Sequence, residues 1–301
     1  MSSVIRVSHL SKQFKDISAV SDLSFSVRQG EVYGFLGQNG AGKSTTIRML
    51  LTLIEPSAGE IEIFGYNLAR HRKQILPKIG AVIEKPDLYK YLTAYENIRL
   101  FALLGGKRIN RTELMKRLDR VGLAARAHSK VKTFSQGMKQ RLGLAVALVN
   151  EPDLIILDEP VNGLDPQGIA DIRELILRLS HEENKTVFIS SHLLAEMEMI
   201  ADHMLIIDKG KIIIEGSVKD LLNPETTTVE LQANDPGRVC ELIRVSHWNS
   251  GFRSYTSGKI MLEMNTADIP ALNRFLVQQG VDVLSLKPRH TLEDYFLSLT
   301  R

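Results

Sequence analysis

Nine consecutive residues, 37–45, have the composition of a loop that binds phosphate, and they match the pattern G-x-x-x-x-G-K-[ST]. The nine residues are Gly37, Gln38, Asn39, Gly40, Ala41, Gly42, Lys43, Ser44 and Thr45. Glycines let the backbone turn tightly around phosphates and present successive N–H groups to the anion. Lys43 can bridge the outer phosphates as a point charge, and the Ser44 hydroxyl can ligate Mg²⁺. The loop therefore predicts a site for a nucleotide and Mg²⁺.

Two adjacent carboxylates, Asp158 and Glu159, follow the unbroken apolar run 154–157. Taken alone, such a run is more often a buried strand with a solvated end. In a chain that also contains a phosphate loop, however, an aspartate at the end of a buried strand can reach Mg²⁺ through water. The next carboxylate can orient or deprotonate an attacking water. The pair therefore favours hydrolysis of a phosphoanhydride.

The elements that must position these residues form an alternating strand and helix pattern. Strand-like residues 32–36 precede the phosphate loop, and a helix over 46–53 follows it with an N-terminus that favours negative charge. The apolar runs 154–157 and 186–189 are typical of strands buried on both faces of a parallel sheet. Further strands are predicted at 4–9, 19–27, 60–64, 204–207 and 211–215, a helix at 172–179, and helical spacing from about 87 to 150.

The strand and helix pattern is interrupted at the linker 222–225, which divides the chain into two parts. The length of 301 residues also fits about two domains. The second part predicts a small α+β domain. Its strands are expected at 229–232, 259–263 and 281–286, and its helices at 238–245, 271–279 and 292–299.

Composition excludes several classes of protein. Lysine and arginine number 38 and aspartate and glutamate 35, so the net charge of +3 gives no reason to expect nucleic acid as a partner. The single cysteine, Cys240, cannot form an internal disulfide. No apolar run approaches the roughly 18 to 20 residues that span a bilayer, and the N-terminus lacks the apolar core of a secretory signal. We expect a cytoplasmic chain that is not itself a channel.

Three more stretches make the chain resemble a known family. The sequence FSQGMKQR (134–141) precedes the Asp158 strand, VNGLD (161–165) follows it, and His192 comes after the strand 186–189. In this order and spacing, residues 1–220 resemble the ATP-binding subunit of ATP-binding-cassette (ABC) transporters. The form of the first stretch and the segment IEKP (83–86) are similar to the exporter branch that includes bacitracin-, antibiotic- and lantibiotic-resistance cassettes.

The resemblance implies an α/β phosphate-loop NTPase cassette over residues 1–220. It would have a mixed sheet core, an antiparallel β subdomain and a helical subdomain over about 87–150, with a small α+β accessory domain at 221–301. ATP and Mg²⁺ are the implied cofactors.

The resemblance also assigns roles to single residues. Phe14, 29 residues before Lys43, would stack on adenine, although alone it could be a packing residue. Glu84 takes the place of a glutamine that contacts Mg²⁺ and senses the membrane partner, with a simple surface acid as the alternative. His192 would contact the γ-phosphate and the water rather than being a solvated loop histidine. Glu159 would be the base.

Other implied residues act across a pair of chains. Ser135 and Gly137 would close over the γ-phosphate of ATP bound by the opposite protomer, and Asp165 would lie at the interface. Two copies, a homodimer, would thus sandwich two ATP molecules head to tail. Gln136 and Met138 depart from the usual L-S-G-G-Q signature, but the two residues suited to phosphate contact are kept.

The family further implies an integral membrane permease as partner, through which ATP hydrolysis by this chain would drive export of a drug, an antibiotic peptide or a lipid-like compound. The permease would place the chain at the cytoplasmic face of the membrane. The segment 85–95, with Tyr89, Tyr91 and Tyr95, would form its docking groove, although core packing could explain at least one tyrosine. Three alternatives remain. They are a non-transport ABC ATPase, which usually has tandem cassettes or coiled coils, a silent ATP-binding regulatory subunit, and a phosphotransferase.

Overall fold

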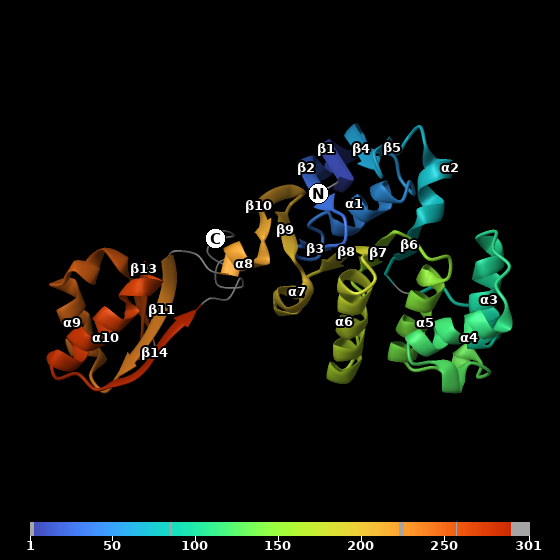
Figure 1. Cartoon of the computed structure of the whole chain (residues 1–301). Coiled ribbons are helices and arrows are strands. Elements are labelled where there is room, and N and C mark those ends of the chain that lie inside the picture. Colours follow the sequence, from blue (N-terminus) through green and yellow to red (C-terminus); the bar gives the residue numbers. More distant parts are fainter. Residues whose placement is uncertain (1–2, 85, 223–225, 257, 290–301) are drawn as a thin grey trace. The chain divides into compact units, whose positions relative to one another are not determined.

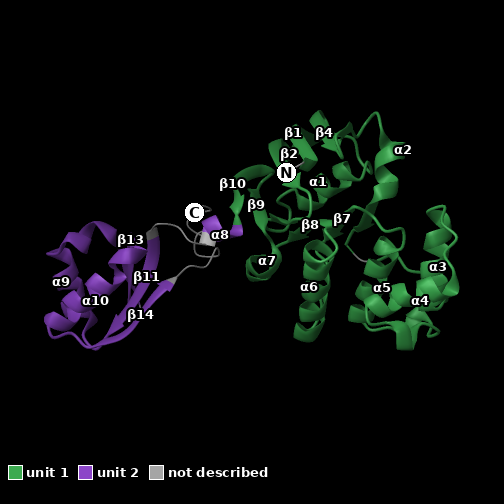
Figure 2. Ribbon diagram, viewed as in Figure 1, with its two compact units in different colours: residues 1–217 green, residues 218–301 purple. Residues whose placement is uncertain are grey.

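The computed structural model of the chain describes residues 3–84, 86–222, 226–256 and 258–289. The chain divides into two units, Met1–Ser217 and Val218–Arg301 (Figure 2). Within the described ranges, no helix combines the length and the apolar character needed to cross a membrane.

The apolar runs of the first unit form a mixed sheet, which in the described residues has six strands in the order β10-β9-β3-β8-β7-β6 (Figure 1). Strand β10 is antiparallel to β9, and the other pairs are parallel. The bounds are β3 Val32–Leu36, β6 Ile79–Val82, β7 Leu154–Asp158, β8 Thr186–Ser191, β9 His203–Asp208 and β10 Lys211–Ser217. Every residue of β3, β7 and β8 is buried, which explains their unbroken apolar sequences and confirms the strands predicted there.

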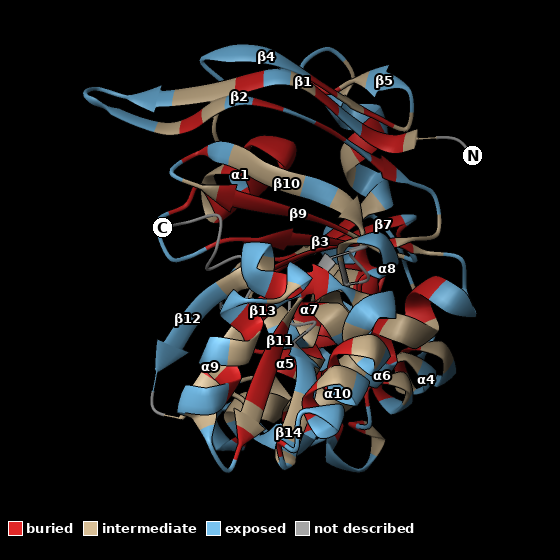
Figure 3. Ribbon diagram, turned by 90° about the vertical axis from the view of Figure 1, so that its left-hand side faces the viewer, coloured by how far each residue is buried: buried red, intermediate tan, exposed pale blue. Residues whose placement is uncertain are grey.

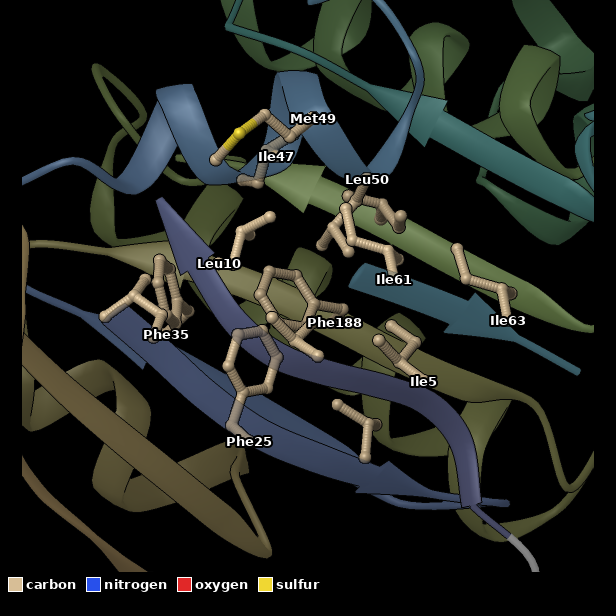
Figure 4. Packing of buried hydrophobic residues seen from close by; sticks show 14 of the residues in the cluster. Ile5, Leu10, Phe25, Phe35, Ile47, Met49, Leu50, Ile61, Ile63 and Phe188 are labelled. Atoms are coloured by element: carbon tan, nitrogen blue, oxygen red, sulfur yellow. The ribbon is translucent and has the colours of Figure 1, made fainter. Parts of the chain in front are cut away.

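A second, antiparallel sheet has the strand order β2-β1-β4-β5 among the described residues. Its strands are β1 Ser3–Phe14, β2 Ile17–Arg28, β4 Ala58–Ile63 and β5 Tyr66–Asn67. Phe25 of β2 joins the two sheets, because its ring lies 5.8 Å from Tyr33 and 6.1 Å from Phe188, measured between centroids. Ile5 and Leu10 of β1 are buried in the same cluster (Figure 4).

The described helices of the first unit fall where the helical spacing predicted them, with additional short helices. They are α1 Lys43–Leu50, α2 Arg72–Ile75, α3 Ala94–Leu104, α4 Arg111–Arg120, α5 Gln136–Leu148, α6 Pro166–His181 and α7 Leu194–Ile200. Helix α1 begins at Lys43, three residues before the predicted start, because Gly42 of the phosphate loop is its N-cap. It ends at Leu50, so residues 51–53, which were predicted to be helical, lie beyond its end.

The edge strand β6 was not predicted from the sequence. It has four residues, and its second one, Gly80, packs so closely on α5 that an added Cβ would lie 2.3 Å from the Ala147 carbonyl oxygen. A glycine in a short strand weakens the strand pattern, although here it permits close packing.

The second unit has the chain order βαββαβ after the short helix α8 (Val218–Leu222), with the described strands ordered β12-β13-β11-β14. Its elements are β11 Thr226–Ala233, α9 Pro236–Arg244, β12 Phe252–Thr256, β13 Lys259–Asn265, α10 Ile269–Gln278 and β14 Val283–Arg289. Val239 and Ile243 of α9, with Leu272 and Leu276 of α10, cover one side of the sheet. Most of the predicted elements are confirmed.

Two predictions in this unit have a different outcome. Strand β12 was missed, because four of its five residues are exposed and it carries no apolar alternation, as its mostly pale colour shows (Figure 3). The predicted helix 292–299 and most of the linker 222–225 lie outside the described residues.

Candidate active site

The phosphate loop connects β3 to α1 and depends on its glycines. Gly40 and Gly42 have φ values of 84° and 109°, a backbone region that other residues rarely adopt. An added Cβ at Gly42 would lie 2.6 Å from the Ala19 carbonyl oxygen, and one at Gly37 would lie 2.5 Å from that of Ile207. Gly40 is therefore required for its backbone conformation, Gly37 for space, and Gly42 for both.

Lys43 points back into the curve of this loop. Its side chain is only 5% exposed, and its Nζ donates hydrogen bonds to the carbonyl oxygens of Gly37 at 2.7 Å and Gln38 at 3.2 Å. The same ammonium lies 3.2 Å from Oε1 of Glu159. A buried cation is thus held at the loop where the sequence predicts phosphate oxygens.

Glu159 links Lys43 to His192. Its other carboxylate oxygen, Oε2, lies 2.7 Å from Nδ1 of the histidine. The Glu159 backbone has a φ of 50°, and its N–H donates to the carbonyl oxygen and the hydroxyl of Ser190. The positive φ turns the chain sharply after β7, so the structure brings together a lysine, a carboxylate and an imidazole from three separate segments.

Asp158, at the end of β7, has the chemistry of a cation ligand. Its side chain is fully buried, and Oδ1 accepts a hydrogen bond from the Ser190 hydroxyl. Its Oδ2 is buried and has no hydrogen-bond partner in the described part of the chain. An unpaired buried carboxylate oxygen is costly unless a cation or water satisfies it. This oxygen therefore fits Mg²⁺, either directly or through water.

A complete metal cage is not formed by side chains alone. Among the described residues, no group of three or more histidine, cysteine, aspartate or glutamate side chains could hold a metal ion. A cation here would therefore need Asp158, the Ser44 hydroxyl and oxygens of the nucleotide.

Phe14 is the last residue of β1 and is 45% exposed. It pairs with Ile17 across the hairpin, two residues before Ala19, whose carbonyl packs against Gly42. The hairpin that carries Phe14 thus contacts the phosphate loop through Ala19, and Lys12 Nζ lies 4.9 Å from the centroid of the Phe14 ring.

Glu84 lies just after β6 and forms an ion pair with Arg48 of α1, with Oε1 2.7 Å from the guanidinium. Its backbone φ is 54°. Lys85, the next residue of the IEKP segment, lies outside the described residues. The structure thus connects Glu84 to the helix that follows the phosphate loop.

Ser135, Gly137 and Asp165 line one hollow of about 480 Å³. Ser135 is the N-cap of α5, where its side chain accepts the Met138 N–H, and Asp165 caps α6 by accepting the Gly168 N–H. No phosphate-loop residue is among those that line this hollow. The candidate residues of this chain therefore fall into two groups on different parts of the unit.

The aromatic segment before α3 is partly exposed. Tyr91 is 80% exposed and Tyr89 52%, whereas Tyr95 is half-buried with its ring 6.1 Å from that of His128. Buried Asn97 fixes the loop by accepting the Tyr89 N–H and donating to the Tyr89 carbonyl. Tyr95 is thus the most buried of the three tyrosines, and Tyr89 also has a ring contact, 6.2 Å from Phe101.

The sequence analysis missed two residues of the site. Ser190 supports both carboxylates, and Arg48 binds Glu84. Ser190 carried a signal, because it ends a buried strand beside the Asp158 strand and carboxyl ends of parallel strands share one edge. The only sequence signal for Arg48 was that it follows Ser44 by four residues, which is about one helical turn.

Known proteins resemble this chain in sequence. The pattern of the family described as ABC transporter matches residues 20–162. The bacitracin transport ATP-binding protein BcrA of Bacillus licheniformis is 42% identical over 300 residues, which are 99% of this chain and 98% of the relative. The lantibiotic transport ATP-binding protein SrtF of Streptococcus pyogenes is 41% identical over 212 residues, 70% of this chain and 90% of the relative.

Solved structures resemble it in fold. The structure of an ATP binding subunit of an ABC transporter aligns with a TM-score of 0.65 and 34% identity, over 72% of this chain and 91% of that one. The dimeric cassette MJ0796, in a post-hydrolysis state bound to ADP and Pi, aligns with a TM-score of 0.64 and 26% identity, over 71% and 98%. The chain therefore belongs to the ABC transporter family, as one of its ATP-binding, ATP-hydrolysing subunits.

Proposed function

We propose that two copies of this chain bind two ATP molecules head to tail and hydrolyse them only when paired. The observation that supports this most is the separation of the site into two groups. Lys43 and Glu159 lie at the phosphate loop, whereas Ser135 and Asp165 line a hollow that includes no residue of that loop. A partner's hollow would supply the second half of each site, and the dimeric cassette MJ0796 is a neighbour in fold.

In the proposed mechanism, Glu159 accepts a proton from the attacking water as the water oxygen bonds to the γ-phosphorus. The bond from this phosphorus to the β–γ bridging oxygen breaks, and ADP and inorganic phosphate leave. Lys43 offsets negative charge on the outer phosphates, and His192, held at 2.7 Å from Glu159, positions the γ-phosphate and the water. Ser44, Asp158 and Glu84 are proposed to hold Mg²⁺, which when bound offsets the charge of the β- and γ-phosphates.

Binding of the nucleotide is proposed to use the backbone and one aromatic ring. Phe14 would stack on adenine with its exposed face. The backbone N–H groups of the loop and of the first turn of α1 would donate hydrogen bonds to the phosphates. The loop residues with this proposed role are Gly37, Asn39, Gly40, Ala41, Gly42, Lys43, Ser44 and Thr45. From the opposite chain, Ser135 and Gly137 would contact the γ-phosphate.

We propose that the motion of this pair drives export through a separate membrane permease, with the chain held at the cytoplasmic face of the membrane. The exposed Tyr89 and Tyr91 support docking at the segment before α3, because aromatic side chains are enriched at protein interfaces. The names of BcrA and SrtF suggest a peptide antibiotic as the compound exported. No nucleic-acid partner is proposed, since the net charge is only +3.

We propose a separate role for each of the two parts of the chain. Residues 1–220 would be the ATPase domain, with the helical subdomain at about 87–150. Residues 221–301 would be an accessory domain. Intact Lys43, Glu159 and His192 favour an active enzyme over a silent regulatory subunit.

Mixing two inactive variants tests the composite site. Lys43→Ala should lose ATP binding at its own loop, and Ser135→Arg should block the hollow that serves the partner. Each variant alone should be inactive. In an equal mixture half of the pairs are mixed and each has one intact site of two, so about a quarter of the wild-type activity should return.

Thermal unfolding of each variant is the control that both chains fold. If the mixture stays as inactive as its components while mixed pairs are detected by pull-down of a tagged chain, the head-to-tail arrangement is wrong. If the Ser135→Arg chain alone keeps wild-type activity, the hollow has no part in hydrolysis.

A further inference from the structure

We infer that Arg48 is a positioning residue for the nucleotide site: it holds the Glu84 carboxylate beside the phosphate-loop helix and offsets its charge. The inference rests on the proposed function, because it places Glu84 beside the bound nucleotide. The resemblance places a neutral glutamine at the position of Glu84. Pairing with Arg48 explains how this chain accommodates a negatively charged carboxylate there.

The loop that carries Glu84 is held on two sides. Arg48 binds the carboxylate at 2.7 Å, and the backbone at Glu84 has a φ of 54°. A non-glycine residue in this region persists only where its surroundings hold it. On the other side, Pro86 packs against Gly143 of α5 so closely that an added Cβ would lie 2.4 Å from the proline Cγ. The side chain of Glu84 is therefore directed toward α1.

The position of Arg48 on α1 brings this pair near the proposed metal ligand. Arg48 follows Ser44 by four residues, so both side chains lie on one face of the helix. The rise between them is about 6 Å. Through Arg48, Glu84 is thus tied to the helix whose second residue is Ser44, the proposed metal ligand.

The charge balance at the site makes the pair necessary. Asp158, Glu159 and Glu84 supply three carboxylates, and ATP adds several negative charges. Lys43 pairs with Glu159 at 3.2 Å, whereas the cation that pairs with Glu84 in the described residues is Arg48. Without Arg48, the Glu84 charge would be unpaired, and beside the bound nucleotide of the proposed function it would repel the phosphates.

The test compares the ATP affinity of a single and a double variant. Binding is measured in EDTA, so that no metal contributes. Arg48→Gln should weaken the binding of a fluorescent ATP analogue about five- to tenfold at low salt. In the absence of metal, Arg48→Gln/Glu84→Gln should recover most of the affinity that Arg48→Gln loses, because the neutral amide needs no cation. The matched control is the exposed pair Arg6–Glu62 between β1 and β4, where Arg6→Gln should leave ATP binding unchanged.

The outcomes separate the inference from the proposed function. Rescue by the double variant, with the same melting temperature in both variants, supports Arg48 acting through Glu84 rather than through folding stability. A double variant as weak as Arg48→Gln, or an Arg48→Gln chain that binds like the wild type, overturns the inference and leaves the proposed function standing. A wild-type chain that binds no ATP even with Mg²⁺ overturns both.

Discussion

Glu159 occupies a position that only the folded chain could create. It follows β7, turns through a positive φ, and its carboxylate touches Lys43 with one oxygen and His192 with the other. The N–H is held by Ser190 from the neighbouring strand. A carboxylate fixed in this way loses little entropy when it accepts a proton from water, which suits the role of a general base.

We expect Glu159→Gln to lower ATP hydrolysis by about 10²- to 10⁴-fold, the usual cost of losing a general base. ATP binding should persist, because the amide keeps the shape and the phosphate loop is unchanged. Single-turnover hydrolysis and equilibrium binding measure the two effects separately. The control is Glu174→Gln, an exposed acid on α6. Wild-type turnover in Glu159→Gln would mean that another group is the base.

At the level of single residues, the sequence predicted the motif positions better than their contacts. The spacing of glycines and Lys43 indicated the phosphate loop, because that chemistry is local in the chain. Ser190 and Arg48 were missed because their roles depend on neighbours 31 to 36 residues away. Only the packing of β7 beside β8, and of the β6 loop beside α1, creates those contacts.

Among the elements, α3 and the segment before it present the surface proposed to bind the permease. Thr93 begins the helix with a capping box, and the pKa of Glu96 is lowered because its carboxylate accepts hydrogen bonds from the Thr93 N–H and hydroxyl. Buried Asn97 ties the Tyr89 backbone to the helix. The exposed rings are therefore carried by an ordered segment.

Replacing Tyr91, which is 80% exposed, by serine should weaken co-purification of the permease without changing ATP hydrolysis by the isolated chain. Truncating an aromatic hot spot of an interface costs about 2 kcal/mol, or roughly 30-fold in affinity. Tyr66→Ser, at a 46% exposed tyrosine of β5, is the matched control. Equal recovery of the permease with both variants would place the docking surface elsewhere.

The sequence predicted most elements, and its failures have physical causes. Strands buried on both faces, such as β7 and β8, can be recognised in the sequence as apolar runs. The edge strand β6 is short and contains Gly80, and β12 is largely exposed, so neither has the pattern that a buried strand imposes. Both are specified by pairing with a neighbour rather than by their own residues.

At the scale of the whole molecule, one chain is proposed to carry two half-sites. The phosphate loop with Lys43, Asp158 and Glu159 is one, and the hollow with Ser135 and Asp165 is the other. Fold similarity to a dimeric cassette bound to ADP and Pi is in accord with pairing of these half-sites between chains. Hydrolysis should then depend on how many chains are paired.

The most direct measurement is the rate of ATP hydrolysis per chain over a wide range of protein concentration, with the oligomeric state followed by sedimentation. The rate per chain should fall steeply on dilution, in proportion to the fraction of paired chains. A constant rate per chain in samples that sediment entirely as single copies would contradict the central claim.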